Sequence, residues 1–342
     1  MKRSVEGNSL KWTYSKAGVN LKKVKKIHAF LQNYLNFPRR KEVLLGVGHY
    51  ASLIEIQEKV LALHVDGVGT KILIALKAKK LDTIGIDCVA MNVNDLLCVG
   101  AEPLAFLDYL ALAKADEEMV KEVMRGLAKG VEEANVSLVG GETAIVPDLI
   151  KVPLDLIGMA IGICDKDKLI LGNKIEEGDI VIGLESSGLH SNGYTLVRKV
   201  LLSKYNLEDK LEGLDRSLKE ELLEPTRIYV KPILNLLKEN LEVKGLAHIT
   251  GGAFTKLSRL IKGKDLSFKL NLPKPKPIFE IIKKEGNIED LEMYKTFNMG
   301  IGFCVIASKK DSDRVIDSLE KQVKAYRIGY VDKGEGIYIG NR

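Results

Sequence analysis

The stretch Val60-Leu61-Ala62-Leu63-His64-Val65 runs directly into Asp66-Gly67-Val68-Gly69-Thr70-Lys71, and an apolar segment from Ile72 to Ala78 follows. The first stretch is typical of a buried strand, the second of a glycine-containing loop, and the third of a helix. A loop at the carboxyl end of a strand is a preferred place for a ligand in α/β proteins. These residues therefore predict an α/β fold with a binding loop from Asp66 to Lys71.

Helical and extended segments alternate along almost the whole chain, which favours α/β layers over separate runs of strands and helices. Further strands are predicted over 105–112, 136–139, 154–163, 180–184 and 245–249, and helices over 21–35, 83–99, 116–131 and 194–202. A length of 342 residues suits two domains. The charged segment Asp165-Lys166-Asp167-Lys168 is the predicted boundary, which divides the chain into residues 1–165 and 166–342.

The composition, with 46% hydrophobic and 29% charged residues, is that of a globular chain. The net charge of +6 is modest, and clustered arginines with stacking aromatic residues are missing, so no nucleic acid partner is expected. No segment reaches the ~18 consecutive apolar residues of a membrane span, and no secretion signal begins the chain. The four cysteines are scattered singly, and a cytoplasmic location is predicted.

Three carboxylates occupy separate predicted elements: Asp66 ends a strand, Asp95 lies within the helix over 83–99, and Glu142 follows Gly140 and Gly141. Asp is disfavoured in the middle of a helix, so Asp95 indicates a charged partner, with a lysine ion pair as the alternative. Magnesium prefers a few carboxylates together with phosphate oxygens and water. Glycines let backbone N–H groups approach phosphates. The pattern fits Mg²⁺ bound to a nucleoside triphosphate, and Lys71 supplies a positive charge for the phosphates.

A competing motif is Gly46-Val47-Gly48-His49-Tyr50-Ala51, which matches the G-x-G-x-x-A pattern of a dinucleotide-binding unit. Only Val43-Leu44-Leu45 precede it as a strand, and the apolar stretch that follows is short for a crossover helix. The chain also carries no G-x-x-x-x-G-K-[ST] loop. Both familiar nucleotide-binding motifs are therefore disfavoured.

Among the histidines, His190 lies in the polar loop Ser186-Ser187-Gly188-Leu189-His190-Ser191-Asn192-Gly193 at a predicted helix start. This setting suits proton transfer or a contact with a substrate phosphate, and a loop-stabilising hydrogen bond is the alternative. His64 lies inside a predicted strand and is expected to be structural.

Longer motifs cover nearly the whole chain: Asp66 to Lys71, Met91-Asn-Val-Asn-Asp95, Leu138-Val-Gly-Gly-Glu-Thr-Ala144, Ser186 to Tyr194, Pro225-Thr-Arg-Ile-Tyr-Val230 and His248-Ile-Thr-Gly-Gly252. This set resembles the phosphoribosylformylglycinamidine cyclo-ligases, also called aminoimidazole ribonucleotide synthetases, of de novo purine biosynthesis. Several of the motifs are shared with a wider superfamily of ATP-using enzymes.

The resemblance implies two domains, an N-terminal one with a mixed sheet that pairs with a second subunit in a homodimer, and a C-terminal α/β domain. It also implies an ATP-dependent ligase that uses Mg²⁺ and acts on formylglycinamidine ribonucleotide, whose formyl-amide oxygen is phosphorylated before the ring closes. Another ATP-using superfamily member, such as a small-molecule kinase or a relative of formylglycinamidine ribonucleotide synthetase, is the alternative enzyme. A non-catalytic nucleotide or RNA binder is the alternative of a different class.

Residue roles follow from the same resemblance. Nucleotide binding is expected at Asp66, Gly67, Gly69, Thr70, Lys71, Asp87, Asp95, Gly140, Gly141 and Glu142, with Asp66, Asp95 and Glu142 on the metal. Substrate binding is expected at His190, Ser191, Asn192, Thr250, Gly251 and Gly252. Lys71, Asp95 and His190 are the expected catalytic residues.

Overall fold

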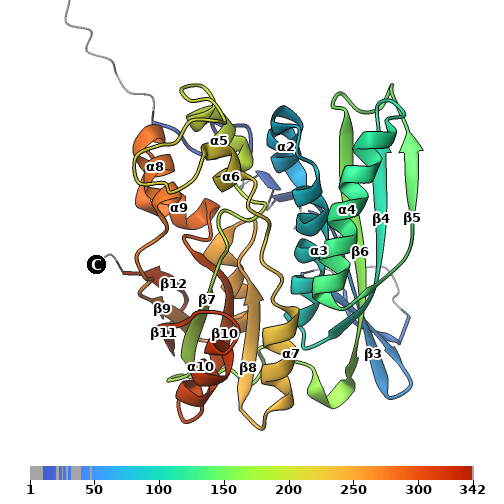
Figure 1. The fold of residues 1–342 in the computed structure, drawn as a ribbon. Coiled ribbons are helices and arrows are strands. Elements are labelled where there is room, and N and C mark those ends of the chain that lie inside the picture. The colour runs from blue at the N-terminus through green and yellow to red at the C-terminus, as the bar shows by residue number, and fades with distance from the viewer. Residues whose placement is uncertain are drawn as a thin grey trace, which may run out of the picture.

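The computed structural model describes residues 11–20, 23–24, 26–27, 30–31, 40–46 and 48–340. Within these residues the chain forms two six-stranded sheets with helices between and around them (Figure 1). The helix predicted over 21–35 falls mostly outside the described residues, and so does Val47 of the Gly46–Ala51 loop.

The first sheet is built from the first half of the chain and is mixed, because β4 and β5 run parallel while its other neighbours are antiparallel. Its strands, in spatial order, are β1 (Val43–Leu45), β2 (Ser52–Ile56), β3 (Lys59–Gly67), β6 (Leu154–Asp165), β4 (Glu102–Leu112) and β5 (Ser137–Ile145). The predicted α/β class with a mixed N-terminal sheet is confirmed. Strand β2 follows the Gly46–Ala51 loop, so the crossover helix that a dinucleotide-binding unit requires is not found there. This agrees with the expectation that the motif does not bind a dinucleotide.

The second sheet is built from the second half and is mostly antiparallel, with one parallel pair between β9 and β12. Its strands, in spatial order, are β12 (Gly336–Ile339), β9 (Leu266–Leu270), β11 (Ala325–Lys333), β7 (Ile180–Glu185), β10 (Ile301–Ala307) and β8 (Val243–His248). The gap between β6 and β7 separates the two sheets in sequence. A domain division between residues 165 and 166 stays a prediction.

The helices lie against these sheets and between them (Figure 1). The α-helices are α2 (Ile72–Ala78), α3 (Asp82–Leu97), α4 (Glu117–Ala134), α5 (Tyr194–Leu201), α6 (Leu218–Leu222), α7 (Val230–Lys238), α8 (Pro277–Gly286), α9 (Asp290–Thr296) and α10 (Ser312–Glu320). The 3₁₀ helices are η1 (Gly69–Lys71), η2 (Lys166–Lys168) and η3 (Ala253–Ile261). Asp116 caps α4, since its side chain accepts a hydrogen bond from the backbone N–H of Met119 at 3.0 Å. None of the described helices is long and apolar enough to cross a membrane.

Helix α3 is the central element, because every residue from Thr83 to Leu97 is buried. It packs on the first sheet with one side and faces elements of the second half, including α7 and β8, with another (Figure 1). A helix buried all round must find a partner for each polar side chain that it carries. Asp87, Asn92, Asn94 and Asp95 are such side chains, and their partners build the site described below.

Strand β5 corrects one expectation. The strand predicted to stop at Gly140 continues through both glycines to Ile145, paired with β4. A Cβ atom on Gly141 would lie 2.5 Å from the Oδ1 atom of Asp108 on β4. The missing Cβ thus permits a close side-chain approach inside a sheet, so the two adjacent glycines do not end the strand.

The contact between α3 and α4 also depends on glycine. A Cβ atom on Gly85 would lie 2.3 Å from the backbone nitrogen of Leu127, and one on Gly126 would lie 1.8 Å from the carbonyl oxygen of Asp82. Since both obstructing atoms belong to the backbone, the helices must separate to admit a methyl group.

Gly85→Ala is therefore expected to lower the free energy of unfolding by about 1–3 kcal/mol, the usual cost of overpacking. Urea denaturation measures the change. Gly140→Ala is the matched control, because nothing lies within 4 Å of a Cβ at that position. Equal stability of the two variants would contradict the packing argument.

Candidate functional site

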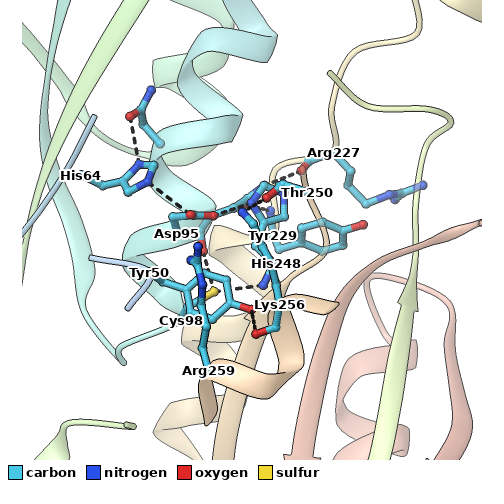
Figure 2. Close-up of polar contacts among 12 residues, drawn as sticks. Tyr50, His64, Asp95, Cys98, Arg227, Tyr229, His248, Thr250, Lys256 and Arg259 are labelled. Carbon is cyan, nitrogen blue, oxygen red and sulfur yellow. Dashed lines mark hydrogen bonds and ion pairs between the residues drawn. The ribbon is translucent and has the colours of Figure 1, made fainter. Parts of the chain in front are cut away.

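The centre of the candidate site is the carboxylate of Asp95, which is held between two histidines from different halves of the chain (Figure 2). The Nε2 atom of His64, on β3, lies 3.2 Å from Oδ2, and the Nδ1 atom of His248, on β8, lies 2.7 Å from Oδ1. All three side chains are largely buried. Asp95 thus meets two imidazoles, of which only that of His64 carries a charge, and no lysine pairs with it within the described residues.

The charge on His64 follows from the groups around it. Asn92 donates both amide hydrogens, to the carbonyl oxygens of Asp66 at 3.1 Å and Cys88 at 2.9 Å, so its oxygen faces Nδ1 of His64 at 3.1 Å. The other ring nitrogen faces a carboxylate. Because both nitrogens meet acceptors, both carry hydrogen, and His64 is an imidazolium.

His248 has the opposite setting. Asn94 accepts from the backbone N–H of Tyr229 at 2.9 Å and donates to the carbonyl oxygen of Arg227 at 2.9 Å. Its amide nitrogen therefore also faces Nε2 of His248, at 3.4 Å, as a donor. His248 is then neutral, with its one hydrogen on Nδ1 and directed at Asp95.

The pKa directions agree with these assignments. Burial lowers the pKa of His64, whereas the negative charges of Asp95 and Asp66 raise it by favouring the cation. The charges outweigh burial, so the pKa of His64 is raised overall. Burial lowers the pKa of His248 despite its bond to Asp95. For Asp95, burial raises the pKa, but the charges of Lys256 and His64 and the histidine hydrogen bonds together hold it well below its usual range. Asp95 is therefore an anion at neutral pH.

Asp66 lies beside this cluster, at the end of β3 on the same sheet face as His64. It accepts a hydrogen bond from its neighbour, the backbone N–H of Gly67, at 2.8 Å. Burial and the negative charge of Asp95 raise its pKa. Asp66 and Asp95 thus share one electrostatic environment.

Glu142 does not join them within one chain. It is exposed on β5, and β6 and β4 separate that strand from β3. Gly140 and Gly141 are exposed on the same edge strand. In the part of the chain that the structure describes, no group of three His, Cys, Asp or Glu side chains is placed to hold a metal ion. Two of the three predicted carboxylates are therefore brought together, and the third is not.

Lys71 and Asp87 form a fully buried ion pair, with the lysine nitrogen 2.7 Å from Oδ2 of the aspartate. The lysine also donates to the carbonyl oxygen of Glu224 at 2.6 Å. The other oxygen of Asp87 accepts from the backbone N–H and the hydroxyl of Thr226, at 2.7 and 2.6 Å. Burial lowers the pKa of Lys71 even beside this anion. The pair joins the two halves of the chain and exposes none of Lys71 to a phosphate.

The remainder of the Asp66–Lys71 loop is more open. Gly69 and Thr70 are exposed, and Gly69 adopts a φ of 71°, which a side chain would disfavour. The hydroxyl of Thr70 lies 3.0 Å from that of Thr195 at the start of α5. The loop thus ends at the junction between the two halves.

The predicted substrate residues gather around two buried donors without a partner in the described chain. The Nε2 atom of His190 accepts a hydrogen bond from the backbone N–H of Ser187 at 3.2 Å, so its hydrogen is on Nδ1, which is buried and unpaired. The amide nitrogen of Asn192 is likewise buried and unpaired. Unsatisfied buried donors are costly, and a ligand oxygen would satisfy them.

These donors lie close to the turn from Thr250 to Gly252. A Cβ atom on Gly251 would lie 3.1 Å from the side-chain oxygen of Asn192, and the rings of His190 and His248 are 6.5 Å apart. Ser191 bonds the hydroxyl of Thr226 at 3.2 Å and supports the loop from the other side. Burial lowers the pKa of His190 well below its ordinary value, and the charges of Lys71 and Arg227 act in the same sense, so it is neutral.

Comparison with known proteins shows to which family the chain belongs. Two family models match it, the N-terminal domain of AIR synthase related protein over residues 48–164 and the C-terminal domain over residues 176–340. The chain belongs to the AIR synthase related family. Among its relatives, the phosphoribosylformylglycinamidine cyclo-ligase of Pyrococcus furiosus is 47% identical over 334 residues, which cover 96% of this chain and 98% of that protein. The enzyme of the same name from Methanocaldococcus jannaschii is 47% identical, covering 93% of this chain and 92% of its own.

Solved structures share the AIR synthase fold at lower identity. The thiamine-monophosphate kinase of Stenotrophomonas maltophilia has a TM-score of 0.62 and 20% identity, covering 92% of this chain and 95% of its own. AaThiL in complex with AMPPCP and TMP has a TM-score of 0.67 and 17% identity, covering 94% and 95%. PurL of T. maritima in complex with ADP has a TM-score of 0.61 and 16% identity, covering 92% of this chain and 46% of its own.

Two residues of this AIR synthase family site, His64 and Lys256, were not predicted from the sequence. His64 was expected to be structural, although it contacts Asp95 directly. The alternation of β3 offered a signal, since residues 64 and 66 share one face of a strand. Lys256 carried no sequence signal, because η3 brings it to the site only through tertiary packing (Figure 2).

The buried ion pair of this family member gives a stability test. Lys71→Met is expected to lower the free energy of unfolding by about 3–5 kcal/mol, because it leaves the Asp87 charge buried without its cation. The double variant Lys71→Met/Asp87→Asn removes both charges and keeps an acceptor for Thr226, so it should lose less. Guanidinium denaturation measures both. A double variant less stable than Lys71→Met would contradict the pairing.

Proposed function

We propose that this chain is a cytoplasmic, ATP- and Mg²⁺-dependent cyclo-ligase of purine biosynthesis that converts formylglycinamidine ribonucleotide to aminoimidazole ribonucleotide. The observation that carries the proposal is the 47% identity with cyclo-ligases over nearly the full length of both chains. The composition gives no reason to add a nucleic acid partner.

The chemistry requires a poor leaving group to become a good one. The formyl-amide oxygen of the substrate takes the γ-phosphoryl group of ATP, the amidine nitrogen then attacks the activated carbon, and inorganic phosphate leaves with that oxygen. Positioning and charge neutralisation supply most of the catalysis in phosphoryl transfer. The anionic Asp95, set between His64 and His248, provides a fixed group against which substrate and nucleotide can be oriented.

Magnesium would suit the carboxylate oxygens of this site. Asp66 keeps one oxygen free of the hydrogen bond from Gly67, and each oxygen of Asp95 retains a lone pair beyond its histidine contact. We assign these two residues to the metal, and when bound it neutralises the phosphate charge. The metal role of Glu142 and the nucleotide roles of Gly140 and Gly141 stay predictions.

On the substrate side, we assign the unpaired N–H groups of His190 and Asn192 to oxygen atoms of formylglycinamidine ribonucleotide. The backbone of Thr250, Gly251 and Gly252 completes this side, because Gly251 is exposed and carries no side chain that would block an approach. The phosphate roles of Gly69 and Thr70 are consistent with the exposure of both residues, and Gly67 is partly exposed at the end of β3.

Wild-type protein is expected to convert ATP to ADP and phosphate only when formylglycinamidine ribonucleotide is present, and to form aminoimidazole ribonucleotide in equal amount. Asp95→Asn should lower kcat about 100-fold or more, because it removes the anion that both histidines orient. Asp313→Asn, on the exposed surface of α10, is the control.

The proposal fails if ATP turnover is independent of this substrate. A stable phosphorylated product, detected by mass spectrometry, would instead favour a small-molecule kinase.

The proposed enzyme is a homodimer formed through the first sheet. Helices α3 and α4 cover one face of that sheet (Figure 1). The opposite face carries Val65, which is 64% exposed, and Tyr109, together with partly exposed Ile157, Met159 and Ile161 of β6. An apolar sheet face of this kind is typical of an interaction surface.

Val65→Lys is therefore expected to shift the protein from dimer toward monomer, because it buries a charge in an apolar contact. Light scattering coupled to size-exclusion chromatography gives the mass of each variant. Leu291→Lys, which changes a residue of similar exposure on α9, should leave the mass unchanged. A monomeric wild-type protein would refute the dimer.

A further inference from the structure

A phosphoryl-transfer site needs a cation that can touch phosphate oxygens. Lys71 is the cation expected from the sequence, but it is sealed in its ion pair with Asp87, with no exposed surface. The pKa values of the Asp66 and Asp95 carboxyl groups are nevertheless influenced by a nearby lysine. Burial raises the pKa of Asp95, and the charge of Lys256 is the strongest of the influences that lower it. Burial and the charge of Asp95 raise the pKa of Asp66, and the charge of Lys256 partly offsets that rise.

Lys256 reaches the site from η3, in the second half of the chain, directly after the Thr250–Gly252 turn (Figure 2). It donates a hydrogen bond to the hydroxyl of Thr250. A lysine ammonium has three hydrogens, so two remain for another acceptor. Within the described residues Lys256 forms no ion pair with a carboxylate, and its side chain is partly exposed. It is thus a cation that remains available to a ligand.

The position of Lys256 is fixed by Tyr50, which is buried beneath it. The Lys256 nitrogen lies 5.7 Å from the centre of the Tyr50 ring, and the Tyr50 hydroxyl donates to the Lys256 carbonyl oxygen at 3.3 Å. Arg259, one turn further along η3, stacks over the same ring at 5.0 Å and bonds the carbonyl oxygen of His49. Cations over an aromatic face are held without loss of their charge.

The groups around Lys256 also suit a phosphate with its metal ion. The exposed turn residue Gly251 lies beside Asn192, whose amide nitrogen is unpaired. Asp66 and Asp95, on the other side, suit a metal ion that accompanies a phosphate. An unpaired cation, an unpaired amide and two carboxylates together fit a metal-bound phosphate better than a neutral ligand.

We propose that Lys256 binds a phosphate group of the reactants and so takes the role that Lys71 cannot fill. The inference rests on the proposed function, because that function names the reactants. The phosphate is either the triphosphate of ATP or the 5′-phosphate of formylglycinamidine ribonucleotide. Both offer the same anionic oxygens, and the experiment separates them.

Lys256→Met and Lys256→Arg are compared with wild type in steady-state assays in which ATP and the ribonucleotide are varied in turn. Lys256→Met is expected to raise one KM about 10- to 100-fold, the effect of losing a charge-assisted hydrogen bond. A higher KM for ATP assigns Lys256 to the triphosphate, and a higher KM for the ribonucleotide assigns it to the 5′-phosphate. Lys256→Arg keeps the charge and should recover at least part of the loss.

Lys262→Met is the matched control, because Lys262 is exposed just beyond the end of η3 and its change removes the same charge. Thermal unfolding of each variant shows whether it folds. The proposal is overturned if a folded Lys256→Met keeps both KM values within twofold of wild type, or if Lys262→Met has the same effect.

Direct binding separates this inference from the proposed function. Isothermal titration calorimetry of Mg-ATP and of the ribonucleotide with wild type and Lys256→Met needs no turnover. Tighter binding of either one by wild type supports the role of Lys256 even if no aminoimidazole ribonucleotide is formed. Equal affinities of the two proteins for both reactants would overturn it.

Discussion

The buried negative charge of α3 is the constraint on which the site and the union of the two halves depend. An isolated carboxylate inside a protein is too costly to persist, so each one must be compensated. Asp87 is compensated by Lys71 and by Thr226, and Asp95 by His64 and His248. In both cases some partners come from the second half of the chain. The same contacts therefore align the halves and shape the site between them.

The two carboxylates have different consequences for function. Asp87 is sealed with Lys71 in a pair that no solvent reaches and links the two halves through Thr226, and its nucleotide role stays a prediction. Asp95 is surrounded by side chains with defined hydrogen-bond directions, from Asn92 through His64 to His248 and Asn94. Such a network holds a carboxylate in one orientation and in one charge state. It leaves neighbouring donors, those of His190 and Asn192, without partners and available to a ligand.

Electrostatic balance connects this network to Lys256. Because the charge of Lys71 is paired with that of Asp87, the positive potential beside Asp66 and Asp95 comes from Lys256 on η3 and from His64. Tyr50 holds η3 in place, so the short segment before β2 helps to position the cation. Lys256, which no sequence signal marked, thereby becomes part of the candidate site.

Local sequence was sufficient for the elements and for many of the site residues. Apolar patterns predicted β3, α3, α4 and β6 nearly as they stand, because such elements follow from periodicity. The motif set indicated the family. Tertiary structure alone decided that β5 runs through its glycines, that Lys71 is sealed, and that His64 and Lys256 face Asp95 and Asp66. These outcomes depend on which distant side chains share a low-dielectric interior, and local sequence does not encode that proximity.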